Sequence, residues 1–240
     1  MSAKRIRTRR AQASIIGVAV LVTVTVISIG ALTMAAGTFV EDSVAAANTQ
    51  RVADDLARIG ESGDDTTRIE FSHGTLRTEP RTVRLLRGEG SVATVEADAL
   101  VYESRGRRVA SLGGTLVEGR SGQSRLRGPL PLVVGEDRLL VDVVALNVSG
   151  PDAVSGSSPV SVTVRTNATH EYRTLEASQY AVAVETATPG AWERAFATVG
   201  FEISRRDFDD DGVPSVVEAV PEPVVVDLAV HDLRAVVRRG

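Results

Sequence analysis

The most uniform hydrophobic stretch of the chain runs from Ile15 to Val40 and contains no charged residue. Apolar residues occupy all of its sides, which is not the one-sided pattern of a helix that covers a water-soluble core. As a helix, its 26 residues would extend over about 39 Å, because each residue adds about 1.5 Å. This length exceeds the ~30 Å of hydrocarbon in a bilayer. The pattern therefore predicts a transmembrane helix.

Beyond this stretch the hydrophobic pattern becomes one-sided. Apolar residues continue at spacings of three to five, with polar residues between them, which is typical of an amphipathic helix. Gly60 and the polar segment after it predict the end of the helix. We therefore expect a transmembrane and stem helix over residues 12–60. The apolar positions of its second half are Val40, Val44, Ala47, Val52, Leu56 and Ile59.

From residue 67 to residue 240 the pattern changes to short alternating segments separated by glycine-containing turns. Such segments predict an antiparallel β-rich domain. Residues 150–159 are rich in Ser, Gly and Pro, which predicts a loop and a candidate boundary between two β subregions. The clearest strand candidates are Arg68–Phe71, Thr82–Leu86, Ala99–Tyr102, Thr115–Val117, Arg138–Val148, Val160–Val164, Tyr180–Val184, Phe201–Ser204 and Val224–Val237.

A short helix is expected within this β region. Thr188 suits the N-cap and Pro189 the first turn, and Gly200 marks the end. Trp192 and Phe196 are four residues apart, so they share one helix face and are expected to pack on a sheet. The expected fold class is α+β: a long N-terminal transmembrane and stem helix, followed by an antiparallel β-rich domain with one short helix.

Charge and composition limit the cellular location and the partners that we expect for this domain. The leader, residues 1–11, carries five basic residues and no acidic one, and basic residues stay on the cytoplasmic side of a membrane segment. We therefore expect a single-pass protein of the cell membrane, with a cytoplasmic N-terminus and an extracellular domain. Removing those five from the 27 basic residues leaves 22 against 31 acidic ones, a formal charge of −9, which argues against a nucleic-acid partner. With no cysteine in the chain, disulfides and thiol catalysis are excluded.

The junction between leader and hydrophobic stretch carries a further signal. The residues are Arg9-Arg10-Ala11-Gln12-Ala13-Ser14-Ile15-Ile16-Gly17-Val18. This junction resembles the class III signal peptide of archaeal type IV pilins and pilin-like proteins. The resemblance implies cleavage by a prepilin peptidase between Ala11 and Gln12, followed by packing of the hydrophobic helix against other pilin-like subunits. Ile16 stands where bacterial pilins usually have Glu, a difference that is compatible with the archaeal branch.

A second part of the chain is similar to haloarchaeal pilin-like proteins of undefined function. It comprises the expected short helix with Trp192 and Phe196 and the strands that flank it. Two other interpretations of the N-terminus stay open. One is an uncleaved membrane anchor, and the other is a secretory signal cut after Ala47, which follows Ala45 and Ala46.

An acidic segment near the C-terminus fits a calcium-binding pattern. Calcium requires several hard oxygen ligands, and the spacing D-x-D-x-D-G-x5-E supplies them around a tight turn. The alternative is an acidic hairpin turn with Asp211-Gly212 as the turn pair, because the flanking residues have strand patterns. The ligands that the calcium interpretation predicts are Asp207, Asp209, Asp211, the backbone carbonyl of Val213, and Glu218.

Two further motifs are glycosylation sequons, Asn147-Val148-Ser149 and Asn167-Ala168-Thr169. No nucleophile motif, phosphate-binding loop or dinucleotide fingerprint occurs, and the three histidines are isolated in the sequence. The sequence thus predicts no enzyme. It favours a membrane-anchored, pilin-like cell-surface protein, a minor or accessory subunit of a type IV pilus-like structure. The alternative is an anchored extracellular binding module, calcium-binding or not, that joins no filament.

Overall fold

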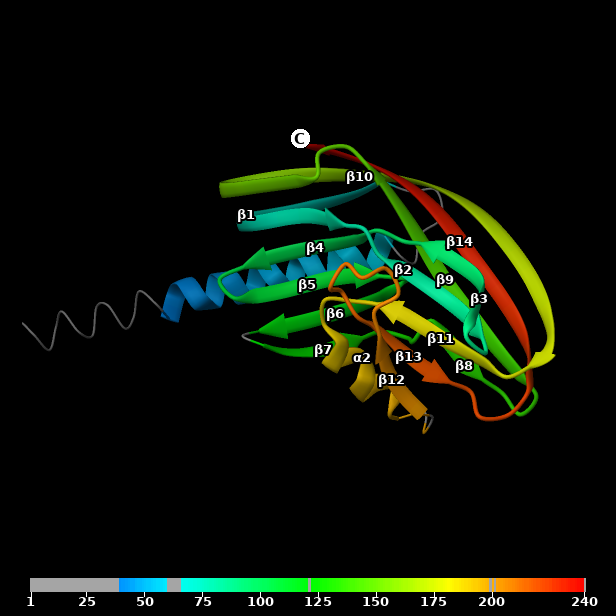
Figure 1. Cartoon of the computed structure of the whole chain (residues 1–240). Coiled ribbons are helices and arrows are strands. Elements are labelled where there is room, and N and C mark those ends of the chain that lie inside the picture. Colours follow the sequence, from blue (N-terminus) through cyan, green and yellow to red (C-terminus); the bar gives the residue numbers. More distant parts are fainter. Residues whose placement is uncertain (1–38, 60–65, 121, 199, 201, 240) are drawn as a thin grey trace, which may run out of the picture. The chain divides into compact units, whose positions relative to one another are not determined.

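The computed structural model describes residues 39–59, 66–120, 122–198, 200 and 202–239. The chain divides into two units, Met1–Val44 and Ala45–Gly240. Residues 39–59 are helical, and every described strand belongs to the second unit. These strands form two sheets, and the short helix α2 (Pro189–Phe196) lies beside β7 and β13 (Figure 1).

The larger sheet has nine strands and contains the longest elements of the chain. In spatial order they are β7 (Gln123–Arg127), β6 (Thr115–Arg120), β5 (Arg107–Leu112), β4 (Ala99–Ser104), β1 (Thr66–Glu79), β10 (Ala153–Ser178), β14 (Val224–Arg239), β9 (Arg138–Ser149) and β8 (Leu132–Val134). All neighbours are antiparallel except β14 and β9, which run parallel. After β10 the chain forms β11, α2, β12 and β13 before it returns to the larger sheet as β14. This long connection lets β14 run parallel to β9.

The smaller sheet has five strands, all antiparallel. In spatial order they are β12 (Glu202–Arg206), β13 (Ser215–Ala219), β11 (Tyr180–Glu185), β2 (Thr82–Arg87) and β3 (Gly90–Glu96). Its strands come from two distant parts of the sequence, and they join because β11 pairs with β2 between residues 180 and 87 at one end and 184 and 83 at the other.

Part of one face of the nine-stranded sheet is covered by the helix. Val52 and Leu56 are completely buried in a cluster that includes Phe71, Tyr102 and Leu233 from the sheet. The spacing of four places both helix residues on one side, as the apolar pattern predicted. The helix is thereby fixed to the β strands by hydrophobic burial, the main favourable term in folding.

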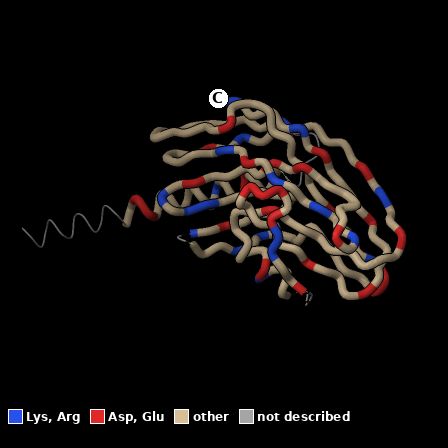
Figure 2. Tube along the Cα trace, in the orientation of Figure 1, with Lys and Arg blue, Asp and Glu red and all other residues tan. Residues whose placement is uncertain are grey.

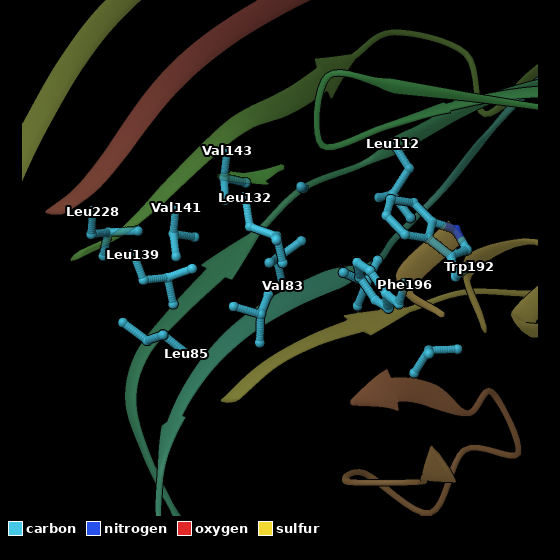
Figure 3. Close-up of a cluster of buried hydrophobic side chains, with 14 of the residues drawn as sticks. Val83, Leu85, Leu112, Leu132, Leu139, Val141, Val143, Trp192, Phe196 and Leu228 are labelled. Carbon is cyan, nitrogen blue, oxygen red and sulfur yellow. The ribbon is translucent and has the colours of Figure 1, made fainter. Parts of the chain in front are cut away.

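The opposite face of the same sheet packs against the smaller sheet. Figure 3 shows valines and leucines of both sheets meeting in this cluster, with Trp192 and Phe196 of α2 beside Leu112. Both aromatic side chains are fully buried, with ring centroids 5.7 Å apart. The expected short helix and its packing are confirmed, although Thr188 makes no side-chain cap to a helix N–H.

The structure corrects the expected α+β fold class with its long N-terminal transmembrane and stem helix. Over the residues that the structure describes, the protein is mostly β-sheet, with 65% strand and two helices. Within the described residues, neither helix has the length and apolarity needed to cross a membrane. The described helical residues 39–59 carry exposed charges at positions such as Arg51 and Asp54. These charges make the segment too polar for a membrane span. The predicted span Ile15–Val40 lies outside the described residues, apart from its last two.

Residues 150–159 also differ from the expected loop. β10 begins at Ala153 and continues through this segment, where Val154 and Val160 are buried in the helix-facing cluster. Gly156 makes this possible, because a Cβ there would lie 2.1 Å from the side chain of Val160. The residues Ser, Gly and Pro therefore mark an irregular part of a strand.

The first prediction tests the attachment of the helix. Leu56→Ala removes a fully buried side chain and should lower the free energy of unfolding by about 2–5 kcal/mol. The matched control is Leu140→Ala in β9, where the leucine is 41% exposed and the loss should stay below about 1 kcal/mol. Urea unfolding of the full chain in detergent measures both. Equal losses would contradict the packing described for the helix.

Candidate functional site

The acidic segment Asp207–Gly212 lies in the connection between β12 and β13. Its carboxylates bind the backbone of their own loop. The Asp207 carboxylate accepts hydrogen bonds from the N–H groups of Asp209 at 3.3 Å and Gly212 at 3.0 Å. The Asp211 carboxylate accepts one from the N–H of Val213 at 2.8 Å. Side chains used in this way stabilise the turn itself.

Asp209 has a separate role, because it reaches back to the smaller sheet. Its Oδ2 accepts a hydrogen bond from Nη2 of the buried Arg84 at 2.5 Å, and Glu185 lies 3.6 Å from the other side of that guanidinium. The ring of Phe208 lies against the guanidinium groups of Arg84 and Arg206, at 4.9 and 4.8 Å. Since a buried cation needs anionic partners, Asp209 serves to neutralise Arg84.

Glu218 is placed in strand β13, away from the turn. It pairs with Val182 of β11 and Ile203 of β12, is 1% exposed, and neither carboxylate oxygen has a hydrogen-bond partner among the described residues. Burial raises the pKa of Glu218 to about 7. Within residues 39–59, 66–120, 122–198, 200 and 202–239, no three His, Cys, Asp or Glu side chains are grouped to hold a metal ion. Calcium binding by Asp207, Asp209, Asp211, Val213 and Glu218 stays a prediction.

The remaining predicted sites lie elsewhere. Asn147 in β9 and Asn167 in β10 are both exposed strand residues, and the Asn147 amide donates a hydrogen bond to Asp232 at 2.7 Å. Their glycosylation stays a prediction. The processing site at Ala11 and Gln12 lies outside the described residues.

A groove that the sequence did not reveal lies beside the helix. It has a volume of about 720 Å³ and lies between the helix, strands β5 and β6, the turn leading into β7, and α2. We call it the arginine groove. Figure 2 shows basic and acidic residues interspersed along the chain. The charged residues that line it are Arg107, Arg108, Arg120, Arg125, Arg194 and Glu118.

The register of the strands places like charges together in this groove. Arg107 of β5 lies directly opposite Arg120 of β6, and like charges in that position destabilise a sheet. Arg194 of α2 reaches the groove and donates a hydrogen bond to the carbonyl of Ser124. Guanidinium groups so arranged are suited to bind carboxylate or phosphate groups.

Two arginines of this region form ion pairs with carboxylates. Arg125 lies 3.2 Å from Glu118, and Arg108 lies 2.7 Å from Glu103 and 3.0 Å from Glu79. Burial pushes the pKa of Glu79 upward, but hydrogen bonds from Arg108 and a neighbouring arginine outweigh it and hold that pKa below its usual range. Arg108 is therefore held in place by carboxylates, and Arg107 and Arg120 line the groove beside it.

Sequence reasoning missed this groove because the negative net charge of the domain conceals it. Its arginines come from three separate segments, on β5, on β6–β7 and on α2. The number of arginines between residues 105 and 127 is a signal that could have revealed the groove. It indicates a groove only when the hairpin register of β5, β6 and β7 is known.

These features define a class of protein: a two-sheet β domain with a helix buried on one face and a cationic groove beside that helix. The sequence pattern of a family of unknown function (DUF7289) matches residues 10–236. The chain belongs to this family, and the match takes in both the hydrophobic segment and the β strands. No curated protein and no solved structure matches the chain.

The second prediction concerns Glu218. Because its pKa is raised to about 7 in the folded protein from about 4.3 in an unfolded chain, the folded state holds the proton more tightly. Stability is therefore highest below the unfolded pKa and falls as pH rises from about 4 to about 7. The loss should be on the order of 3 kcal/mol.

Glu218→Gln cannot ionise, so its urea-unfolding free energy should not show this fall, and it should exceed that of the wild type at pH 8. The control is Glu222→Gln, an exposed carboxylate in the turn after β13, which should keep the wild-type pH dependence. If both variants keep it, Glu218 is not the titrating group.

Proposed function

We propose that this chain is a pilin-like cell-surface protein, a minor or accessory subunit of a type IV pilus-like structure. The proposal is supported by the order of basic residues, Ala11-Gln12 and the uncharged stretch Ile15–Val40. In this function a prepilin peptidase cuts before Gln12, and the uncharged stretch first resides in the membrane and then packs against the same stretch of other subunits. Small residues such as Gly30 and Ala35 permit close approach.

One structural observation supports this proposal in particular. One side of the helical segment from Ala45 to residue 59 packs against the nine-stranded sheet, with Val52, Ala53 and Leu56 completely covered. Asn48 adds hydrogen bonds of 2.9 Å to the carbonyl and the hydroxyl of Ser72. A subunit that assembles through its N-terminal segment needs such an attachment, because the β domain keeps a defined orientation in the filament only if it is rigidly packed on that segment.

The arginine groove favours a second function for the displayed domain, namely binding. We infer that this groove takes up the carboxylate groups of an acidic polymer, such as a polyuronate. The support is the unusual pairing of Arg107 with Arg120 and the addition of Arg194 from a different element. This function serves an adhesive subunit and an anchored binding module equally well.

The third prediction tests processing. In protein isolated from native membranes, the first residue should be Gln12, as read by N-terminal sequencing or intact mass. Ala11→Trp should block the cut, because the peptidase of the proposed pathway requires a small residue there. The control Ala3→Trp places the same bulk within the leader and should be processed normally. A chain that starts at Ser2 supports an uncleaved anchor, and one that starts at Asn48 supports secretion.

The fourth prediction tests the groove. The variant Arg107→Ser/Arg120→Ser/Arg194→Ser should bind alginate at least tenfold more weakly than the wild type in calorimetry at low salt, and wild-type binding should weaken as salt is added. The control Arg68→Ser/Arg165→Ser/Arg234→Ser removes three exposed arginines from outside the groove and has the same net charge. Equal weakening in both variants would show that binding follows total charge rather than the groove.

A further inference from the structure

His170, His231 and Asp142, which are distant in the sequence, meet on three adjacent strands. His170 in β10 lies directly opposite His231 in β14, and Asp142 belongs to the next strand, β9. Nδ1 of His170 is 2.6 Å from Nδ1 of His231. Nε2 of His231 is 2.9 Å from Oδ1 of Asp142. The three side chains therefore form a chain of polar contacts on a rigid sheet.

The contacts determine where the protons are. The Asp142 carboxylate only accepts hydrogen bonds, so Nε2 of His231 carries a proton and donates it. A neutral His231 then has a bare lone pair on Nδ1. Between two neutral rings, the short contact between the two Nδ1 atoms requires one proton, and that proton belongs to His170. Two ring nitrogens thus point at one position between β10 and β14, and this position holds a single proton.

We propose that His170 and His231 bind a late first-row divalent metal ion, such as Zn²⁺, through their two Nδ1 atoms, with Asp142 as the positioning residue for His231. Neutral imidazole is the preferred nitrogen ligand of these ions. A carboxylate on the far nitrogen of a metal-bound histidine fixes its orientation and strengthens the bond. The metal replaces the shared proton, which moves through solvent to Nε2 of the exposed His170, so both rings stay neutral.

The geometry requires only a small adjustment. Two nitrogens bound to a tetrahedral zinc at 2.0–2.1 Å are about 3.3 Å apart, so the 2.6 Å contact must open by roughly 0.7 Å. His170 is exposed and can rotate outward by this amount. The remaining coordination positions face solvent, beside the 71% exposed Tyr172, and are open to water or to a ligand from another molecule.

The Asp142 carboxylate beside the two histidines favours a cation. The Asp142 side chain is half-exposed and His231 is mostly covered, so the carboxylate lies at the rim of the site while the imidazole is held within it. Two imidazoles with an outer carboxylate are a smaller set than the three-residue groups that define most protein metal sites, which predicts micromolar rather than nanomolar affinity. The site is independent of the processing of the N-terminus and of the arginine groove.

The fifth prediction tests this site with Zn²⁺ alone as the probe. The full chain in detergent, freed of metal with a chelator, should bind one Zn²⁺ with a micromolar Kd in calorimetry. His170→Ala and His231→Ala should each weaken binding at least tenfold. Asp142→Asn should weaken it about tenfold, because the amide can present the wrong group to Nε2 of His231.

The control is His73→Ala, which removes the third histidine of the chain, in β1, and should leave the affinity unchanged. Nitrogen NMR of the labelled imidazoles gives a second measurement, since both Nδ1 resonances should shift on Zn²⁺ addition. Thermal unfolding confirms that each variant is folded. An absence of binding at 1 mM Zn²⁺, binding that survives removal of both histidines, or shifts confined to Nε2 would each overturn the proposal.

Discussion

The nine-stranded sheet buries apolar side chains on both of its faces, and most other features of the protein depend on what covers each face. On one face the cover is the helix, through Val52 and Leu56. On the other it is the smaller sheet together with Trp192 and Phe196 of α2. A chain without cysteine and with 4% aromatic residues must gain its stability from many small contacts. Covering both faces of one sheet provides these contacts. Successive side chains of a strand point to opposite faces, so valines and leucines on either face are then buried.

The helix covers only part of its face, and both proposed sites lie where this cover ends. By strand register, Arg107, Arg120 and Arg125 share the face of Val109 and Leu116, which the helix covers. On β14, His231 precedes the helix-covered Leu233 by two residues, so it lies on the same face. Polar groups at such a border are partly desolvated yet accessible, which strengthens charge interactions without excluding a ligand.

Much of the fold follows from the sequence pattern alone. The alternating segments and the Trp192–Phe196 spacing predicted the strands and the short helix, because local periodicity reports which side of an element is buried. The long stem helix of an α+β fold was wrong, and residues 150–159 read as a loop although β10 runs through them. The parallel pairing of β9 with β14 and the pairing of β2 with β11 were not predictable, since they depend on contacts between residues far apart in the chain.

The sites were less predictable than the fold for the same reason. The acidic segment matches a calcium pattern in one dimension, but Asp209 is directed to Arg84, a residue 125 positions away, and Glu218 continues into a buried strand. The two histidines of the proposed metal site are 61 positions apart and looked isolated, while the arginines of the groove lie in a domain of net negative charge. Local spacing identifies ligands only when one segment supplies them all. In a sheet built from distant strands, sites form from residues that meet across strands, and the register decides which residues these are.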